Sequence, residues 1–327
     1  MKLSLAIDRG NGSVKWMAHL EDGRNYLGKF ASMLLQNRGK SDPVSVDGIE
    51  WLYGASAGKV ALGATIRPSE TGAQGKVDHF AVVLAGVLQE LMNRSNIGHN
   101  IEIENLSVVS PVCNPTLKAT YEASLKGRKF CVSGQTLKLK VKSVDVFPEA
   151  SIVLKKSDAD IVLDIGYGTV LGSVRGVEGY SAILENGSEE LLTKLLNHPK
   201  FVSSINAQEG KSSPQVELLA LTLAKGDTSI RSVDLLPFLG ELVPEWFDQN
   251  VIALLPKLRR IAREEGLSSD ALLIGGGSEL LKLALGDRAN DWSNERGCIF
   301  AETSDFASVQ TLGELWAVKT PAIVGGR

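Results

Sequence analysis

Two short Asp-Gly loops lie about half a chain apart, and they constrain the fold of this sequence more than any other feature. Residues 8–15 are Asp-Arg-Gly-Asn-Gly-Ser-Val-Lys, and residues 164–169 are Asp-Ile-Gly-Tyr-Gly-Thr. Each loop separates two apolar, strand-like runs, so each is expected to be the turn of a β-hairpin. A third loop, Ile-Gly-Gly-Gly-Ser-Glu at residues 274–279, follows a strand-like run and opens a helix. The duplication predicts two similar halves that hold one phosphorylated ligand.

The composition is that of an ordinary globular chain, long enough for two cores. Its 327 residues are 43% apolar and 22% charged, and the formal net charge is −3. This balance gives no indication of direct binding to nucleic acid or to an anionic membrane. The three cysteines are scattered, the first residues are too short an apolar run for a signal peptide, and no run approaches the ~18 apolar residues of a membrane span. We therefore expect a cytoplasmic protein with reduced thiols.

The apolar pattern predicts the same βββαβα order of elements in both halves. The elements expected in the first half are strands at residues 3–7, 13–20, 106–110, 128–132 and 136–147, a helix at residues 77–93, and a helix that starts at Asn114-Pro115 with Asn as its N-cap. The elements expected in the second half are strands at residues 160–165, 168–175, 271–274 and 297–300, and helices at residues 188–197, 213–226, 239–265 (bent at Pro244 and Pro256), 278–285 and 309–319.

This order divides the chain into two domains. We expect domain I at residues 1–150, with a small loop-rich subdomain inserted at about residues 26–75. Domain II is expected at residues 151–308, with a helical insertion at about residues 186–240, and residues 309–327 are expected to form a C-terminal helix that returns to domain I. The apolar residues of the first insertion, Trp51, Leu52 and Tyr53 among them, could form either a contact with another molecule or the insertion's own core.

The glycine-rich turns have the chemistry of a phosphate site. Glycine lets main-chain N–H groups approach a phosphate because no side chain blocks the way. Each turn adds a hydroxyl donor, and an ammonium follows the first turn on the next strand. The residues assigned to the phosphates are Gly10, Asn11, Gly12, Ser13, Lys15, Gly166, Tyr167, Gly168 and Thr169. For one loop alone an ordinary Asx turn explains the pattern equally well, and it is the matching pair that favours a ligand.

Asp8 and Asp164 each stand at the end of a predicted strand, directly before a turn. Their carboxylates can accept hydrogen bonds from waters bound to Mg²⁺, which keeps several waters and takes few protein ligands. We therefore predict a Mg²⁺ ion held through water by these two residues, together with a nucleoside triphosphate, ATP or GTP.

The third loop, with Gly275, Gly276 and Gly277 followed by Glu279, is the candidate nucleoside site. Three glycines let the backbone lie flat against a purine or ribose, and the N-terminus of the following helix favours a nearby phosphate. A tight strand-to-helix turn without a ligand is the alternative. The loop matches neither the GxGxxG fingerprint nor the P-loop.

Together these motifs resemble those of the actin and heat-shock-chaperone ATPase superfamily. Residues 6–15 are similar to its phosphate-1 motif, residues 162–169 to phosphate-2, and residues 273–277 to the adenosine motif. Phe-Pro-Glu-Ala-Ser at residues 147–151 resembles the connect-1 segment, and Thr-Leu-Gly-Glu-Leu-Trp at residues 311–316 resembles connect-2. The Asn-Gly turn, the Pro-Glu pair and the short chain look most like the ParM/StbA plasmid-segregation actins.

The resemblance implies an α/β actin-like fold, with two related βββαβα domains around a central nucleotide cleft. It implies an ATPase, possibly also using GTP, that self-associates into filaments and segregates plasmid or other DNA through a DNA-binding adaptor protein. Glu149 would orient the attacking water, so that Glu149, Asp8 and Asp164 form the catalytic set. Glu209 and Lys211 lie where the family often places residues that contact the nucleoside. The alternatives are a surface carboxylate for Glu149 and a solvated loop around Glu209 and Lys211.

Two other functions remain open from the sequence. One is a sugar or small-metabolite kinase of the same superfamily, which needs a catalytic Asp in a substrate cleft and usually a longer chain. The other is a non-polymerising switch whose conformation is set by the nucleotide. Nucleotide-dependent light scattering separates the filament hypothesis from both, and phosphate release stimulated by a sugar favours the kinase.

Overall fold

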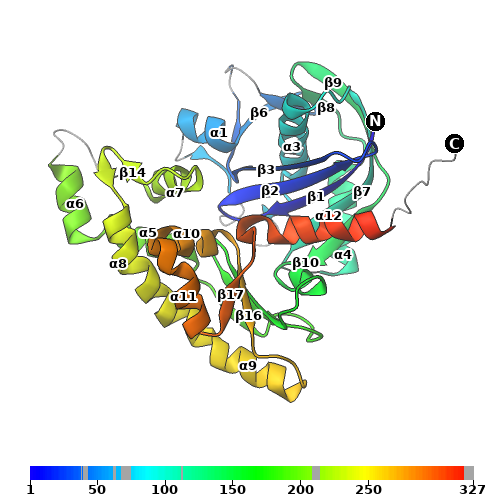
Figure 1. Cartoon of the computed structure of the whole chain (residues 1–327). Coiled ribbons are helices and arrows are strands. Elements are labelled where there is room, and N and C mark those ends of the chain that lie inside the picture. The colour runs from blue at the N-terminus through cyan, green and yellow to red at the C-terminus, as the bar shows by residue number, and fades with distance from the viewer. Residues whose placement is uncertain are drawn as a thin grey trace. The chain divides into compact units, whose positions relative to one another are not determined.

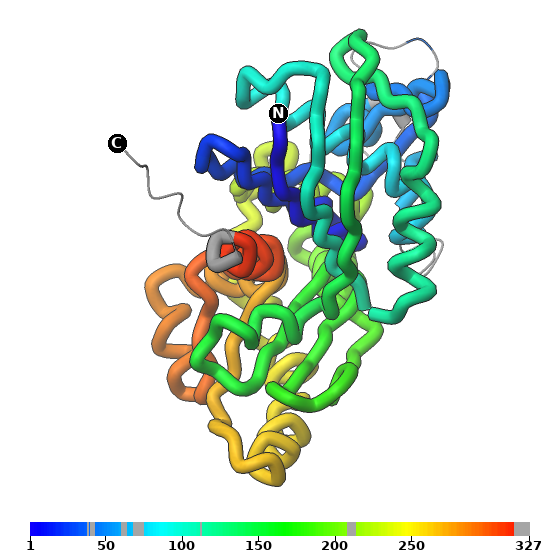
Figure 2. Tube along the Cα trace, turned by 90° about the vertical axis from the view of Figure 1, so that its right-hand side faces the viewer, coloured from blue at the N-terminus to red at the C-terminus, as the bar shows by residue number. Residues whose placement is uncertain are grey.

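The computed structural model describes residues 1–37, 39, 43–61, 64–67, 75–111, 113–207 and 214–319 (Figures 1 and 2). The chain divides into two compact units. Unit 1 consists of Met1–Ile152 and the chain from Ser308 onward, and unit 2 consists of Val153–Ala307. Each unit has its own buried apolar core.

Unit 1 is built on a large mixed sheet. Its strands are β1 (Lys2–Arg9), β2 (Ser13–Leu20), β3 (Asn25–Ala31), β4 (Leu34–Gln36), β5 (Val44–Val46), β6 (Ile49–Tyr53), β7 (Asn100–Ser110), β8 (Phe130–Val132), β9 (Gln135–Val141) and β10 (Val144–Pro148). Its helices are α1 (Gly54–Ala61), α3 (Phe80–Arg94), α4 (Pro115–Leu125) and α12 (Ala307–Lys319), which starts at the unit boundary. Among the described residues the strands join in the order β3-β2-β1-β7-β9-β8-β5-β6-β4, and β10 pairs with a further part of β7.

Helices cover both faces of this sheet around β2. The strand alternates, with Val14, Trp16, Ala18 and Leu20 buried in the core that α3 shares, as expected for a strand with period two. On the opposite face α12 approaches β2 closely, because a Cβ atom at Gly313 would lie 2.3 Å from the sulfur of Met17. Figures 1 and 2 show α12 on one side of the sheet and α3 and α4 on the other.

Unit 2 has a smaller sheet and more helix. Its strands are β11 (Ile161–Ile165), β12 (Val170–Val174), β13 (Ala182–Leu184), β16 (Ala271–Ile274) and β17 (Cys298–Phe300), with a separate pair β14 (Ser229–Ile230) and β15 (Val233–Asp234). Its helices are α5 (Ser188–Leu196), α6 (Pro199–Asn206), α7 (Val216–Ala224), α8 (Leu236–Trp246), α9 (Leu255–Glu264), α10 (Gly276–Leu285) and α11 (Ala289–Glu295). Short helical segments are η2 (Ser151–Lys155), η3 (Phe247–Val251), η4 (Ile252–Leu254), η5 (Gly286–Arg288) and η6 (Ser304–Phe306).

The two units repeat one sheet topology. The order β3-β2-β1-β7-β10 in unit 1 corresponds to β13-β12-β11-β16-β17 in unit 2. The central strand of each set, β1 or β11, pairs antiparallel with the strand that follows it in the chain, β2 or β12. On its other side it pairs parallel with β7 or β16. At one end of the order, β3 is antiparallel to β2 and β13 is antiparallel to β12. At the other end, β10 is parallel to β7 and β17 is parallel to β16. The predicted α/β class with a repeated βββαβα plan is therefore confirmed.

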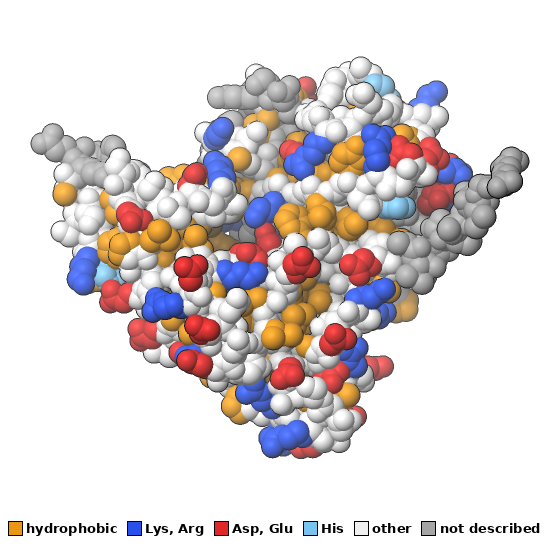
Figure 3. Space-filling view, in the orientation of Figure 1, with side chains coloured by type: hydrophobic (Ala, Val, Ile, Leu, Met, Phe, Trp, Pro, Cys, Tyr) orange, Lys and Arg blue, Asp and Glu red, His pale blue; other side chains and the backbone are white. Residues whose placement is uncertain are grey.

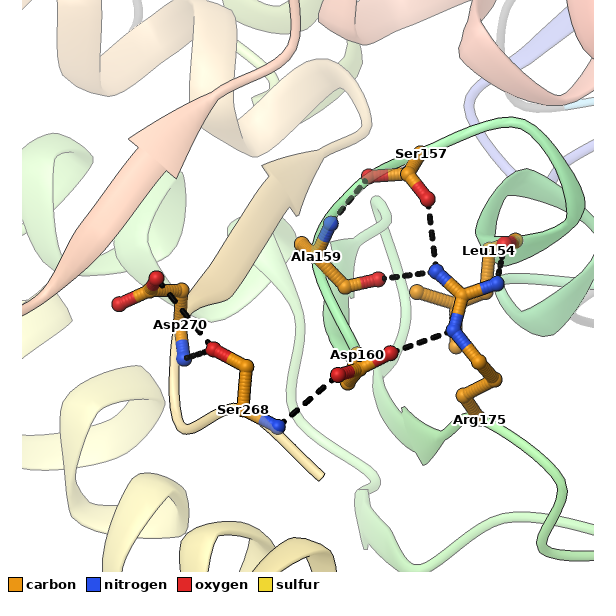
Figure 4. Close-up of polar contacts among 7 residues, drawn as sticks. All are labelled: Leu154, Ser157, Ala159, Asp160, Arg175, Ser268 and Asp270. Carbon is orange, nitrogen blue, oxygen red and sulfur yellow. Dashed lines mark hydrogen bonds and ion pairs between the residues drawn. The ribbon is translucent and has the colours of Figure 1, made fainter. Parts of the chain in front are cut away.

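An arginine anchors the chain where it enters unit 2. Arg175, directly after β12, forms an ion pair with Asp160 at 2.5 Å and donates hydrogen bonds to the carbonyl oxygens of Leu154, Ser157 and Ala159 (Figure 4). The N–H group of Ser268 donates to the other oxygen of Asp160 at 2.9 Å. One guanidinium thus satisfies several carbonyl groups in and after the short helical segment η2.

The inserted region of unit 1 differs from the sequence prediction. The insertion is expected to begin near Tyr26, but Tyr26 lies in β3, which pairs with β2 along its whole length. Trp51 and Leu52 are 8% and 2% exposed and belong to the core of unit 1. Of the two roles open for these residues, the core role is therefore the correct one for Trp51 and Leu52.

Several other predicted elements also have different bounds, among them the strand predicted at residues 106–110, which begins at Asn100 in β7. Residues 136–147 form two strands, β9 and β10, which pair with different parts of β7. The helix expected at residues 213–226 is Val216–Ala224, with Gln215 as its N-cap. The long helix at residues 239–265 is interrupted by η3, a π-helical segment that starts three residues after Pro244, and α9 starts with Pro256 in its first turn. Proline lacks the N–H that continues a helix but fits its first turn.

Candidate functional site

Among the described residues, the turn between β1 and β2 leaves main-chain donors without a protein partner. It is closed by the N–H group of Gly10, which donates to the carbonyl of Ser13 at 2.9 Å, and the carbonyl of Gly12 accepts from Ser32 at 3.0 Å. In the part of the chain that the structure describes, no acceptor pairs with the N–H groups of Asn11 and Gly12. The turn residues are half-buried. These N–H groups are therefore available to an anionic ligand.

The turn between β11 and β12 is built in the same way. The N–H group of Gly166 donates to the carbonyl of Thr169 at 2.9 Å. Within the described ranges, no protein acceptor pairs with the N–H groups of Gly168 and Thr169. A Cβ atom at Gly10 would lie 3.2 Å from the carbonyl oxygen of Ser13, and one at Gly166 would lie 3.0 Å from that of Thr169. Glycine is therefore favoured at the same point of both turns.

Helix α5 orients the second turn. The N–H groups of Ser188 and Glu189, at the start of α5, donate to the carbonyls of Gly166 and Tyr167 at 3.0 and 2.8 Å. Because the C=O and N–H of one trans peptide point in opposite directions, the N–H of Gly168 points away from α5. Gly187 makes this packing possible, since a Cβ atom there would lie 2.5 Å from the carbonyl oxygen of Tyr167. Sequence reasoning missed Gly187, because this residue belongs to none of the recognised motifs. Its role, to let α5 pack against the second turn, depends on a contact with Tyr167 that only the structure shows.

The triple-glycine loop packs against the second turn within unit 2. Gly275 has φ +89° and donates its N–H to the carbonyl of Ser304 at 2.9 Å, and α10 starts at Gly276. A Cβ atom at Gly275 would lie 2.4 Å from Oδ1 of Asp164, and one at Gly277 would lie 2.1 Å from Cγ2 of Ile165. The structure therefore brings together Asp164, the second turn and the N-terminus of α10.

Glu279, assigned to the nucleoside site, lies on the first turn of α10 and is paired with a residue of its own helix. Its Oε1 is 3.0 Å from Nζ of Lys282. Lys282 also donates to the carbonyl of Ala301 at 3.2 Å and to Oγ of Ser304 at 3.0 Å. Lys282 thus ties α10 to the segment after β17, next to the carbonyl that accepts from Gly275.

The two carboxylates assigned to Mg²⁺ hold equivalent positions in their units. Asp8 is the second-last residue of β1 and Asp164 the second-last of β11, and they are 5% and 8% exposed. Asp8 lies opposite Lys15 of β2, and Asp164 lies opposite Leu171 of β12. A buried carboxylate beside unpaired N–H donors fits a magnesium-bound phosphate, because the acid accepts from metal-bound water and the amides donate to phosphate oxygens.

Glu149 is not a surface carboxylate. It follows β10, and its Oε2 is 3.0 Å from Nζ of Lys76, with the two side chains 13% and 9% exposed. Its N–H donates to the carbonyl of Ser110 at 3.0 Å, and Ala150 behind it has φ +61°. The alternative of an exposed acid at a strand end is therefore wrong. Sequence reasoning missed Lys76, since its partner is 73 residues away.

Arg9, inside the first Asp-Gly loop, is almost fully buried at 1% exposed. Its guanidinium donates to the carbonyls of Gly75 and Asp78, both at 2.6 Å, and of Lys76 at 3.1 Å. Burial lowers the pKa of Arg9 to about 10, against the opposing effects of Tyr121 and Asp78. A buried guanidinium needs such acceptors, so Arg9 fixes the backbone around Lys76.

Tyr121 of α4 borders the same cluster. Burial raises the pKa of its phenol, the Arg9 guanidinium lowers it, and the charges of Glu149 and Asp8 raise it further. Asp8 and Glu149, the predicted water-orienting acid, therefore belong to one buried polar cluster of unit 1. We define this cluster as Asp8, Arg9, Lys76, Tyr121 and Glu149.

Two candidate residues, Glu209 and Lys211, lie outside the described residues. In the part of the chain that the structure covers, no helix combines the length and the apolar character needed to cross a membrane.

Comparison of the sequence with models of protein families finds no match, and comparison with curated proteins finds none either. Solved structures do match over nearly the whole chain. ParM of Bacillus thuringiensis with ATP is 14% identical, with a TM-score of 0.66 over 98% of this chain and all of that one. A 15-stranded ParM filament from Clostridium botulinum is 14% identical, with a TM-score of 0.61 over 97% and 99% of the two chains. A MamK double helical filament is 17% identical, with a TM-score of 0.60 over 98% and 100%.

The chain therefore has the fold of the actin-like proteins. Its solved structural relatives include ParM, MamK and AlfA, so the predicted likeness to the ParM branch is confirmed at the level of the fold.

Proposed function

We propose that this protein is an actin-like ATPase that binds Mg-ATP, or Mg-GTP, and assembles into filaments. The observation that carries the proposal is the matched pair of turns. Each has the same closing hydrogen bond and two N–H groups without an acceptor in the described structure, and each follows a buried aspartate. An ordinary hairpin needs neither the buried acid nor the unpaired donors, whereas a magnesium-bound phosphate uses both, the donors for phosphate oxygens and the acid for water on the metal.

The residues would divide the work as follows. The amides of the turns, with the hydroxyls of Ser13 and Thr169 and the ammonium of Lys15, would hold the phosphates. Asp8 and Asp164 would hold water molecules of the Mg²⁺ ion, which supplies neutralising charge when bound. The N-terminus of α10, at the triple-glycine loop with Glu279, would bind the nucleoside.

Glu149 would orient the water that attacks the terminal phosphate. A group that holds water behind that phosphate is required for in-line hydrolysis. Glu149 fits because it is a partly buried carboxylate in the same cluster as Asp8.

Filament formation is proposed from the fold. The MamK and Clostridium botulinum ParM relatives were solved as filaments. A head-to-tail interface that does not close on itself gives such an open polymer. On the face shown in Figure 3, positive and negative side chains are interspersed. Such mixed charge does not favour direct contact with DNA. The resemblance to plasmid-segregation actins motivates the proposal of a cytoplasmic filament that moves plasmid or other DNA through a DNA-binding adaptor protein.

Binding is tested by thermal unfolding. Saturating Mg-ATP or Mg-GTP should stabilise the protein by about 2.7 kcal/mol at a hundredfold excess over Kd. Asp8→Asn and Asp164→Asn should lose most of this stabilisation. The matched control is Asp22→Asn, an exposed carboxylate at the next turn of the same sheet, paired with Arg24. It should keep the full nucleotide effect, and unchanged melting of the wild-type protein with both nucleotides would refute the proposal.

Assembly is tested by sedimentation and light scattering. Mg-nucleotide should produce sedimenting polymer above a critical protein concentration. Nucleotide binding without polymer, at high concentration and in low and high salt, would leave the non-polymerising switch. Phosphate release that depends on an added sugar would instead establish the kinase.

A further inference from the structure

The ion pair between Lys76 and Glu149 is largely buried. Its side chains are 9% and 13% exposed, whereas the pair between Lys118 of α4 and Asp145 of β10 is 43% and 50% exposed. An exposed pair adds little to stability, and a buried one seldom stabilises more than apolar residues of the same shape. What such a pair does supply is a fixed geometry for both side chains.

Among the described residues, only one oxygen of Glu149 takes part in a hydrogen bond. Lys76 donates to Oε2. Across the described parts of the chain, Oε1 accepts no hydrogen bond, and it is not among the polar atoms sealed from solvent without a partner. A carboxylate with one oxygen held by a cation presents its other oxygen at a fixed position, where the lone pairs of that oxygen can accept a hydrogen bond from water.

Lys76 is itself held in place. Its backbone carbonyl and those of Gly75 and Asp78 accept from Arg9, which follows Asp8 in β1. Contacts therefore run without interruption from the first phosphate turn, through the buried Arg9 guanidinium and the backbone of residues 75–78, to Lys76 and Glu149. All of these residues belong to unit 1.

We propose that Lys76 is a positioning residue for hydrolysis: its ammonium holds Oε2 of Glu149, so that Oε1 faces the attacking water in one orientation. Arg9 fixes the backbone from which Lys76 reaches. Lys76 acts through Glu149 and needs no contact with the nucleotide. This inference rests on the proposed function, in which Glu149 orients the water.

The test is a double-mutant cycle on phosphate release at saturating Mg-nucleotide, with Lys76→Met, Glu149→Gln and the double variant. Each single variant should lower kcat at least tenfold, with KM and nucleotide Kd within about twofold of wild type. In the Glu149→Gln background, Lys76→Met should change kcat by less than about twofold, because the group it positions is already gone. Lys76→Arg, which keeps a cation, should retain more activity than Lys76→Met. The matched control, Lys118→Met, removes the exposed cation paired with Asp145 of β10 and should leave kcat unchanged.

The outcomes separate the two claims. A wild-type protein that binds nucleotide but releases no phosphate would overturn hydrolysis itself, and positioning with it. A hydrolysing wild-type protein with an equally active Lys76→Met variant would overturn positioning alone. If Lys76→Met lowers kcat by the same factor in the wild-type and Glu149→Gln backgrounds, Lys76 has a general structural role, and this result would also overturn the positioning role. If circular dichroism shows Lys76→Met unfolded, Lys76→Ala takes its place, since it also removes the donor to Oε2.

Discussion

Gly275 lies so close to Asp164 that no side chain fits between them: a Cβ atom at position 275 would stand 2.4 Å from Oδ1 of the aspartate. Gly275 also has φ +89°, a conformation that residues with a side chain rarely adopt. The triple-glycine loop and the acid at the end of β11 are therefore one packed unit, and a change in the loop must move the acid.

Gly275→Ala should weaken Mg-nucleotide binding and lower the free energy of unfolding by about 1–3 kcal/mol, because it adds both backbone strain and a clash. Chemical denaturation and nucleotide titration measure the two effects. Gly276→Ala is the matched control, since a Cβ there meets nothing nearer than Asp305 Oδ1 at 3.6 Å. Its unfolding free energy should stay within about 0.5 kcal/mol of wild type. Equal behaviour of the two variants would contradict the packing argument.

Gly187→Ala should disturb the second turn on the side that packs against α5. The added methyl would stand 2.5–2.6 Å from Tyr167 O, Gly166 O and Thr169 N, so the turn must shift away from α5. We expect a loss of about 1–3 kcal/mol in unfolding free energy and a smaller thermal shift with nucleotide. Gly98→Ala, with nothing within 4 Å of its Cβ, serves as the control. A Gly187→Ala protein with wild-type nucleotide affinity would show that this turn does not hold the ligand.

Glu149→Ala should slow phosphate release at least tenfold, which is about 1.4 kcal/mol of barrier, while nucleotide binding stays nearly intact. The reason is that the water loses its orienting acceptor and the phosphates keep their amide donors. Single-turnover assays with equilibrium binding separate the two. Asp145→Asn, which removes an exposed carboxylate from the preceding strand, should hydrolyse at the wild-type rate. A wild-type rate in Glu149→Ala would remove this residue from the mechanism.

Asp160→Asn should destabilise the protein at neutral pH but not in acid. Hydrogen bonds from Arg175 first, and then from the Ser268 N–H group, hold the pKa of Asp160 below its usual value. A carboxyl with a lowered folded-state pKa stabilises above its unfolded pKa of about 3.9, and the effect is lost as pH falls through the folded value.

Urea unfolding of wild type and Asp160→Asn should therefore differ by about 0.5–1 kcal/mol between pH 5 and 7, since the pair is partly exposed, and the difference should shrink below about pH 4. Asp158→Asn, an exposed acid two residues away, should match wild type throughout. A difference that persists unchanged at pH 3.5 would argue against this ion pair as the cause.

Glu50→Lys and Lys59→Glu should block polymer while leaving nucleotide binding intact. Both residues are exposed in the inserted region of unit 1, and Glu50 directly follows Ile49, which is 45% exposed. Charge reversal at a protein interface is repulsive, whereas neither residue belongs to a turn that would hold phosphate. Pelleting assays beside nucleotide titrations test this. Normal polymer from the double variant would place the filament contact elsewhere.

Local patterns in the sequence predicted the elements that carry the candidate site. A glycine turn between two apolar runs specifies a hairpin whatever surrounds it, so β2 has the predicted bounds. The strand before the triple-glycine loop, β16, also has the predicted bounds. Asn114 caps α4 as predicted, accepting from the N–H of Leu117 at 2.8 Å. The assignment of Tyr26 to the main sheet could not be predicted in the same way. Whether its strand, β3, joins the main sheet or the insertion depends on the strand that it pairs with, and this partner is β2.

The sequence by itself determined the two matched turns, the acids before them and the repeated order of elements, because all of these depend on residues within a few positions of each other. Only the tertiary structure decided what surrounds them. Arg9 reaches carbonyls 66 to 69 residues away, and Lys76 reaches Glu149 across 73 residues. Gly187 matters because folding places it against Tyr167. No local pattern marks such residues, since their roles come from close packing and from the cost of leaving a buried charge unpaired.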